Sequence, residues 1–254
     1  MKKIDLVVGA RPNFIKAFPV YRALGELDYF DLRLINTGQH YDPNMVDVFF
    51  KQLNMKKPDI NLGIGSGNHG QQTGKELIEI EKVFIEKMPD LVIVFGDVNS
   101  TIAAALAAKK LHISVAHVEA GLRSFDQSMP EEINRVLTDQ ISDLLFITSP
   151  EAEVNLLKEG KDKDQIHFVG NTMIDSLIRF QPHFDSAHIK DECGFQDKKY
   201  VLITLHRPSN VDNPMNLEQL IDSLNSVAEI APCLWPLHPR TRKQLDNITP
   251  KLHD

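Results

Sequence analysis

Three acidic side chains stand at positions typical of a catalytic site in an α/β protein. Asp97 and Glu119 end short apolar runs and have a glycine within two residues, and Glu131 opens a later helical segment. A neighbouring glycine lets a ligand approach the backbone closely. Carboxylates that share one pocket supply a general acid and a general base. The sequence therefore predicts acid–base chemistry at Asp97, Glu119 and Glu131.

Two of these carboxylates also have a simple structural interpretation. Asp97 precedes Ser100 and Thr101 and has the position of a helix cap. Glu131 lies in the first turn of a predicted helix, where a negative charge complements the helix dipole. The residue types alone leave both interpretations open.

Two cations flank the start of the first predicted helix. Arg11 and Lys16 follow the first apolar run, and the backbone N–H groups at a helix start already favour an anion. Together they predict a diphosphate site. The alternative is that Arg11 pairs with a carboxylate at the sheet edge and that Lys16 is a solvated helix residue.

Histidines occur at several predicted strand ends. His206, with Arg207, and His238 have the side chains to hold phosphate or move a proton, although either could be an ordinary polar loop residue. His117 has no second histidine at helical spacing, so we predict no metal site and interpret His117 as a hydrogen-bonded core residue.

Residues 65–70 match the pattern G-x-G-x-x-G ahead of a helix. The segment before them, residues 58–62, is too polar for the buried first strand of a dinucleotide fold, so NAD binding is not favoured. A glycine-rich lid or substrate loop is the better interpretation.

The elements that position these residues alternate between short apolar runs and longer segments of helical periodicity. Strands that are apolar on both faces, each followed by a helix, indicate a doubly wound parallel sheet of the α/β class. The predicted strands are residues 4–9, 32–37, 91–96, 114–119, 144–148 and 166–169, and the predicted helices are 14–27, 45–53, 71–87, 101–111, 131–141 and 151–159.

A second α/β unit begins at the apolar run 200–204, after a stretch that breaks the alternation. We expect a first domain at residues 1–170 and the beginning of a second at 171–254. The two further strands and two helices predicted there cannot cover both faces of a parallel sheet, so we expect a truncated second domain.

The composition of the chain disfavours some classes of protein and fits others. The 254 residues contain 28 basic and 35 acidic side chains, a net charge of −7, which disfavours a basic nucleic-acid binder. Hydrophobic residues make up 42% and charged residues 25%, as in globular domains. Two cysteines fit a reducing cytoplasm. We expect no membrane span, because no apolar stretch approaches the ~20 residues required.

Six motifs in order along the chain resemble the non-hydrolysing UDP-N-acetylglucosamine 2-epimerase family. The motifs are Gly-Ala-Arg-Pro-Asn-Phe-Ile-Lys at 9–16, Thr-Gly-Gln-His at 37–40, Gly-Asp-Val-Asn-Ser-Thr at 96–101, His-Val-Glu-Ala-Gly-Leu-Arg at 117–123, Pro-Glu-Glu-Ile-Asn-Arg at 130–135 and His-Pro-Arg-Thr at 238–241.

The resemblance implies a GT-B-like architecture of two Rossmann-like domains and the interconversion of UDP-GlcNAc and UDP-ManNAc without NAD or metal. It implies roles for three sets of residues. The implied catalytic residues are Asp97, Glu119, Glu131 and His206; the implied UDP-sugar ligands are Arg11, Lys16, Arg123, Arg135, Arg207 and His238; the implied allosteric residues, for a second UDP-GlcNAc, are Gln39, His40, Gln71 and Gln72.

The chain departs from the family pattern at two places. Ser209 stands where many members have glutamate after His-Arg-x, so the role of that glutamate cannot be transferred. The uridine- and diphosphate-binding segment Ser-Gly-Gly-x-x-Glu-Glu is absent from the 254 residues. We therefore expect turnover from a longer protein rather than from this segment alone.

Other functions remain open from the sequence. They are epimerisation of a modified UDP-sugar such as a diacetamido-uronic acid, a hydrolysing 2-epimerase, a GT-B glycosyltransferase and an inactive nucleotide-sugar sensor. The resemblance also implies a homodimer and a role in surface polysaccharide synthesis.

Overall fold

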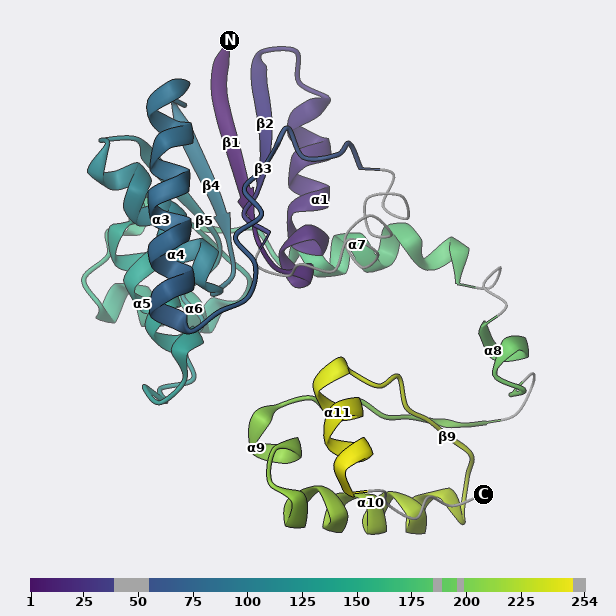
Figure 1. Cartoon of the computed structure of the whole chain (residues 1–254). Helices are drawn as coiled ribbons and strands as arrows, with labels where there is room; N and C mark the ends of the chain where they lie inside the picture. Colours follow the sequence, from purple (N-terminus) through teal and green to yellow (C-terminus); the bar gives the residue numbers. More distant parts are fainter. Residues whose placement is uncertain (39–54, 185–188, 196–198, 249–254) are drawn as a thin grey trace. The chain divides into compact units, whose positions relative to one another are not determined.

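The computed structural model describes residues 1–38, 55–184, 189–195 and 199–248 (Figure 1). The predicted helix at 45–53 and the predicted allosteric residues Gln39 and His40 lie outside these ranges. The chain divides into two compact units, Met1–Gln181 and Pro182–Asp254.

The first unit contains a seven-stranded parallel sheet in the order β3-β2-β1-β4-β5-β6-β7. This confirms the predicted doubly wound α/β class. The strands are β1 Lys2–Val8, β2 Phe30–Asn36, β3 Ile60–Asn61, β4 Leu91–Phe95, β5 Ser114–Ala120, β6 Leu144–Ile147 and β7 Ile166–Phe168. The order reverses between β1 and β4, where ligands bind in open α/β sheets.

Alternate residues of each strand face opposite sides of the sheet and build two apolar cores. Leu6 and Ile93 pack with α1 (Arg11–Gly25), whereas Val7 and Val92 pack with α3 (His69–Glu86) and α4 (Asn99–Lys110). The α5 helix (Pro130–Ile141) packs beside α4, and α6 (Pro150–Lys158) packs on β6 and β7. Buried strands of this kind explain the continuous apolar runs in the sequence.

Strand β3 and helix α7 (Thr172–Phe180) of the first unit were not predicted. The edge strand β3 has only two residues and pairs with β2, and its polar sequence hides it from periodicity. Helix α7 packs on α1, where Ser176 Oγ donates to the Ile15 carbonyl at 2.7 Å and the Phe18 and Phe180 rings lie 5.6 Å apart. The first unit therefore extends to Gln181 rather than ending at residue 170.

The second unit has its own small core. Strands β8 (Val201–Leu202) and β9 (Cys233–Leu234) are parallel neighbours. Buried Val211, Leu217 and Ile221 form its core with Leu245. Its helices are α8 Ile189–Glu192, α9 Pro208–Val211, α10 Pro214–Ala228 and α11 Pro239–Ile248. The two predicted strands and two predicted helices are therefore present.

None of the helices in the described part of the chain is both long and apolar enough to span a bilayer.

Candidate active site

Lys16 and Glu119 form an ion pair at the carboxyl edge of the sheet. Lys16 Nζ lies 2.7 Å from Glu119 Oε1, and the side chains are 9% and 17% exposed. Lys16 comes from the second turn of α1 and Glu119 from the end of β5. The alternative of a solvated helix lysine is wrong, because Lys16 is buried against this carboxylate. The pair places a carboxylate and an ammonium group, both only slightly exposed, at this edge of the sheet.

The backbone at Glu119 has an uncommon conformation. Its φ of +75° lies in the left-handed region, and the pairing of β5 with β6 shifts register between Val118 and Ala120. A non-glycine residue in this region is strained and is typical of functional sites. The bulge turns the Glu119 side chain out of the strand alternation and toward Lys16.

Gly96 connects this pair to Asp97. Its φ is +61°, and a Cβ atom at this position would lie 2.8 Å from Lys16 Nζ and 3.9 Å from Glu119 Oε1. The position needs glycine both for its backbone and for its close approach to Lys16. The loops that carry Asp97 and Glu119 are therefore side by side.

Asp97 pairs with Arg135 of α5. The α5 helix is further tied to this loop by Asn134, whose Nδ2 donates to the Asp97 carbonyl at 2.9 Å and to Asn99 Oδ1 at 3.2 Å. Asp97 does not cap α4, because the N-cap residue is Val98. The structure thus brings together three predicted site residues, Asp97, Arg135 and, through Gly96, Lys16.

The first turn of α5 carries two glutamates with different environments. Glu131 is exposed and lies four residues before Arg135, on the same helix face. Glu132, which the sequence did not single out, is 3% exposed and accepts hydrogen bonds from the Ser124 and Phe125 N–H groups, each at 3.0 Å. Burial raises the pKa of Glu132, but these donors outweigh it and the pKa is lowered. Glu132 therefore holds the 124–125 loop as a carboxylate.

Arg11 begins α1 and is exposed. The turn before it is closed by Asn13, whose Oδ1 accepts from the Gly9 and Ala10 N–H groups at 3.2 and 3.1 Å. Asn13 Nδ2 also donates to the Phe95 carbonyl at 2.9 Å. The helix start that carries Arg11 is thereby fixed to the end of β4, next to Gly96.

Arg123 is the predicted substrate ligand that the structure places in the interior. Its side chain is 1% exposed; Nε and Nη2 bind Glu159 at 2.8 and 2.6 Å, and Nη1 lies 2.8 Å from Asp139 Oδ2. A guanidinium engaged with two carboxylates suits a structural role. The motif could not distinguish this arginine from one that faces a ligand.

His117 is a fully buried histidine with both ring nitrogens engaged. Nδ1 lies 2.6 Å from Asp139 Oδ1 and Nε2 lies 2.7 Å from the Gly96 carbonyl. The prediction of a hydrogen-bonded core histidine is confirmed. Within the described ranges, no group of three or more His, Cys, Asp and Glu side chains is arranged to hold a metal ion.

Helix α3 presents two buried polar side chains, one turn apart, to the start of α4. Gln72 Oε1 accepts from Asn99 Nδ2 at 2.7 Å, and Glu76 Oε1 accepts from Ser100 Oγ at 2.7 Å. Burial raises the pKa of Glu76, and the hydrogen bond from Ser100 opposes the shift only in part. Of the predicted allosteric residues, Gln72 is thus a buried structural neighbour of Asn99, while Gln71 is exposed.

Predicted site residues also gather in the second unit. The rings of His206 and His238 lie 5.7 Å apart, beyond the ends of β8 and β9, and Arg207 is exposed between the strand and α9. Thr241 Oγ1 donates to the Leu205 carbonyl at 2.8 Å and fixes the two loops to each other. The start of α11 beside these rings is a favourable place for an anion.

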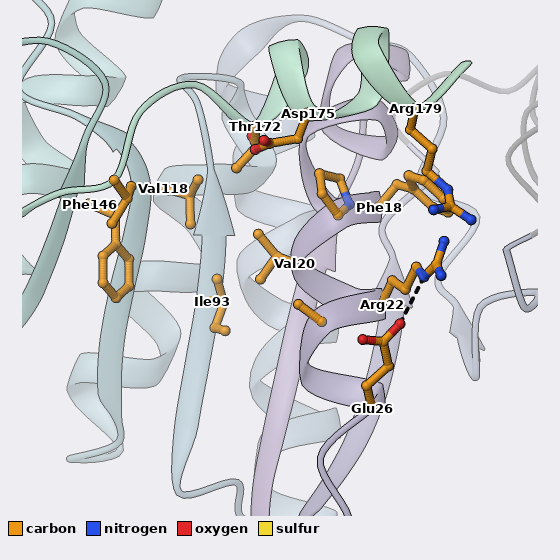
Figure 2. Close-up of a pocket in the computed structure, with 13 residues that line it drawn as sticks. Phe18, Val20, Arg22, Glu26, Ile93, Val118, Phe146, Thr172, Asp175 and Arg179 are labelled. Atoms are coloured by element: carbon orange, nitrogen blue, oxygen red, sulfur yellow. Dashed lines mark hydrogen bonds and ion pairs between the residues drawn. The ribbon is translucent and has the colours of Figure 1, made fainter. Parts of the chain in front are cut away.

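A separate hollow lies on the α1 face of the first sheet. The hollow has a volume of about 660 Å³. Figure 2 shows that Ile93, Val118 and Phe146 from the strands line it, with α1 and α7 beside it. An Arg22–Glu26 ion pair of 3.0 Å stands at its rim. Among the described residues that line it, none is a predicted site residue. The hollow is therefore distinct from the cluster around Lys16 and Glu119.

Comparison with known proteins gives a consistent set of relatives. A model of the UDP-N-acetylglucosamine 2-epimerase family matches residues 22–254. The UDP-N-acetylglucosamine 2-epimerase of Methanococcus maripaludis is 48% identical over 98% of this chain and 68% of that protein. The UDP-2,3-diacetamido-2,3-dideoxy-D-glucuronate 2-epimerase of Pseudomonas aeruginosa is 46% identical over 98% of this chain and 70% of that protein.

Solved structures agree with the sequence relatives. The Methanocaldococcus jannaschii UDP-GlcNAc 2-epimerase, crystallised with UDP-GlcNAc and UDP, is 45% identical and superposes with a TM-score of 0.89 over 97% of this chain and 69% of that one. The expected GT-B-like class is confirmed by this likeness. On both grounds, sequence and structure, the chain belongs to the UDP-N-acetylglucosamine 2-epimerase family.

Proposed function

We propose that the protein is an isomerase that interconverts UDP-GlcNAc and UDP-ManNAc by inverting C2 of the sugar. The observation that carries the proposal is the pair of cation-bound carboxylates, Glu119 with Lys16 and Asp97 with Arg135, at one edge of the sheet. Family membership supplies the reaction class. The predicted residues supply the acid, the base and the charge that such an inversion requires.

The C2 proton of the sugar is only weakly acidic, because no carbonyl group stands beside it. Its removal becomes feasible as the C1–O bond to UDP breaks and C1 gains positive character. A carboxylate takes the proton, the C2–H electrons form a C1=C2 double bond, and the C1–O electrons leave with the UDP oxygen. Glu119, 17% exposed and fixed by Lys16, is suited to this proton transfer.

The second half of the reaction reverses these bonds on the other face. A UDP oxygen re-adds to C1 and a carboxylic acid delivers a proton to C2 from the opposite side, which gives the epimer. Two faces require more than one acid–base group. Asp97 and Glu131, both on the α5 side of the cluster, are the proposed partners of Glu119. Arg11, Lys16 and Arg135 are the proposed groups that stabilise the negative charge of the departing UDP.

The second unit is proposed to contribute residues that bind the diphosphate of the UDP-sugar. His206 and His238 have adjacent rings, and Arg207 stands beside them. Imidazole and guanidinium groups next to a helix start favour phosphate oxygens. We propose His206 as a catalytic residue and Arg207 and His238 as UDP ligands.

The test is proton NMR of UDP-GlcNAc incubated with the protein in D2O. We expect the C2 proton signal to disappear while UDP-ManNAc accumulates. The test includes this 254-residue chain and a longer form of the length of its relatives, because the match covers 68% of the M. maripaludis relative. Release of free ManNAc with UDP would identify a hydrolysing enzyme. Weak binding of UDP-GlcNAc without exchange in either form would indicate an inactive nucleotide-sugar sensor.

A second substrate is favoured by one specific observation. The P. aeruginosa relative, named for a diacetamido-uronate sugar, is 46% identical, close to the 48% of the M. maripaludis relative. Both UDP-sugars are therefore tested under the same conditions. A higher kcat/KM for the uronate would reassign the substrate and leave the C2 inversion unchanged.

The remaining expectations follow the family and stay predictions. They are a homodimer, activation by a second UDP-GlcNAc, a cytoplasmic location and a role in polysaccharide synthesis. Sedimentation of the purified protein and a sigmoidal dependence of rate on UDP-GlcNAc concentration are the direct measurements of the first two.

A further inference from the structure

Asp139 and His117 form a buried pair behind the proposed acid–base cluster, and neither has been assigned a part in the reaction. We infer that they are positioning residues, which fix the Glu119 backbone and the Gly96–Asp97 turn in the arrangement that the proposed C2 inversion requires. This inference rests on the proposed function. Both side chains are 0% exposed, so their action on a substrate is indirect.

Asp139 binds the chain on both sides of Glu119. Its Oδ1 lies 2.6 Å from Nδ1 of His117, two residues before Glu119, and its Oδ2 accepts from the N–H of Gly121, two residues after it, at 3.0 Å. Between these two anchors, Glu119 adopts its φ of +75°. A strained backbone persists only where its surroundings over-determine it. The Asp139 carboxylate supplies that constraint from α5.

His117 extends the constraint to the neighbouring strand. Its Nε2 donates to the Gly96 carbonyl at 2.7 Å, and the Gly96 N–H donates to the Val118 carbonyl at 3.0 Å. Gly96 precedes Asp97, and a Cβ atom added to it would lie 2.8 Å from Lys16 Nζ. The Asp139 carboxylate thus binds the backbone near Glu119 directly, at Gly121. Through the His117 imidazole it also fixes the backbone next to Asp97, at Gly96.

The charge state of the pair is compatible with its burial. Burial raises the pKa of Asp139, but His117 and Arg123 outweigh it and the pKa is lowered, so Asp139 is a carboxylate. The Gly96 carbonyl only accepts hydrogen bonds, and a carboxylate only accepts them, so both ring nitrogens of His117 donate. The Asp139 carboxylate also lies 2.8 Å from Arg123 Nη1, so Arg123 helps to balance its negative charge.

The experiment uses three variants that remove the links one at a time. Asp139→Asn replaces an acceptor with a donor; His117→Asn places an amide near Nδ1 and loses the Gly96 link; His117→Gln places one near Nε2 and loses the Asp139 link. The matched control is Asp90→Asn, since Asp90 also accepts from a backbone N–H, that of Lys3 at 2.8 Å, but at the amino edge of the sheet. All are made in the form of the protein that exchanges the C2 proton.

We expect Asp139→Asn and His117→Asn to slow C2 exchange by about 10²-fold, the effect of a displaced catalytic group. The Kd for UDP-GlcNAc should change by less than about threefold, as for an interaction that acts on kcat. Asp90→Asn should leave both unchanged. Folded Asp139→Asn with wild-type exchange would overturn the inference. If Asp139→Asn does not fold, the two His117 variants, each of which retains one hydrogen bond, decide the question by the same criterion.

A readout without turnover separates this inference from the proposed function. The Nζ resonance of Lys16 reports its contact with Glu119, so it should shift in Asp139→Asn and not in Asp90→Asn. If the wild-type protein exchanges no C2 proton, the proposed function fails, and the Lys16 signal still tests whether Asp139 positions Glu119. An unchanged signal in folded Asp139→Asn overturns the positioning role in either case.

Discussion

Two charged clusters lie next to each other at the carboxyl edge of the first sheet, and their charges differ in exposure to solvent. In the inner cluster, Asp139 and His117 are 0% exposed, and Arg123 is 1% exposed and bound to two carboxylates. In the outer cluster, Glu119 is 17% exposed and Asp97 is 23% exposed, each with one cationic partner. The inner charges hold the chain, whereas the outer charges are partly exposed to solvent.

The comparison teaches that charge at a strand end is not by itself a sign of catalysis. The degree of burial separates a structural charge from a reactive one. Arg123 and Arg135 illustrate this, because both are arginines of recognised family motifs near carboxylates. Arg135 is 17% exposed, whereas Arg123 is 1% exposed. The following predictions test this division.

Glu119→Gln should have the largest effect on activity. The amide keeps the shape of the side chain but cannot take a proton, so C2 exchange should fall by about 10²- to 10⁴-fold. The melting temperature should also fall, because the amide leaves the buried Lys16 without its carboxylate. The control is Glu26→Gln, a surface glutamate paired with Arg22 at 3.0 Å. Wild-type exchange in folded Glu119→Gln would remove Glu119 from the outer cluster's chemistry.

Arg123→Ala should have the largest effect on stability. It leaves Asp139 and Glu159 without their shared guanidinium, and breaking a buried ion pair lowers the free energy of unfolding by about 3–5 kcal/mol. Arg22→Ala, on the surface of α1, should lower it by less than about 1 kcal/mol. Urea denaturation measures both. A stable Arg123→Ala with a much weaker affinity for UDP-GlcNAc would return Arg123 to the ligand-binding set.

Gly96→Ala should affect both properties by an intermediate amount. An alanine at a φ of +61° is strained, and its Cβ would meet Lys16 Nζ at 2.8 Å. The free energy of unfolding should fall by about 1–3 kcal/mol, and C2 exchange should slow as Lys16 moves from Glu119. Gly63→Ala is the matched control, because Gly63 also has a φ of +61° but nothing within 4 Å of its Cβ position. Equal effects of the two variants would mean that the contact with Lys16 is unimportant.

Glu76→Gln should have the smallest effect, visible as a change in pH dependence. The pKa of Glu76 is raised above its ordinary value of 4.5 in the folded protein. The folded state therefore binds the Glu76 proton more tightly than the unfolded state does. The resulting contribution to the free energy of unfolding is complete below about pH 4.5 and is lost as the pH rises through the folded pKa. The free energy of unfolding of Glu76→Gln should rise by about 1 kcal/mol relative to that of wild type between pH 5 and pH 8.

Chemical denaturation across this pH range checks the prediction. The control is Glu79→Gln on the same helix, since Glu79 faces solvent and pairs with Lys82 at 2.7 Å. Parallel curves for wild type and Glu76→Gln would mean that Glu76 is ionised throughout.

The strand pattern and the site motifs were readable from the sequence because they depend on local rules. Apolar runs predicted β1 and β4, and glycine with charge at strand ends predicted the loops of Asp97 and Glu119. Helix α7 was missed, because its apolar residues Ile174 and Ile178 stay exposed and Asn171, its cap, was not weighed. A helix whose place is decided by tertiary contacts with α1 leaves a weak local signal.

Partner choice in the site was not readable. The sequence indicated carboxylates and cations but not that Lys16 takes Glu119, that Arg135 takes Asp97, or that Arg123 turns inward. These pairings depend on side chains 36 to 103 residues apart meeting at the ends of different strands. Glu132 was missed for a related reason, since only helix rotation distinguishes it from the adjacent Glu131. The periodicity of α5, applied residue by residue, is the signal that would have found it.

The division of the chain into two units has a consequence for its thermodynamics. The proposed chemistry draws on residues of both units, yet each unit buries its own apolar core, the larger around α1, α3 and α4 and the smaller around Leu217 and Ile221. Separate cores melt separately unless they are coupled. A calorimetric scan of the free chain should therefore resolve two heat-absorption peaks, and UDP-GlcNAc, if it engages both units, should draw the peaks together.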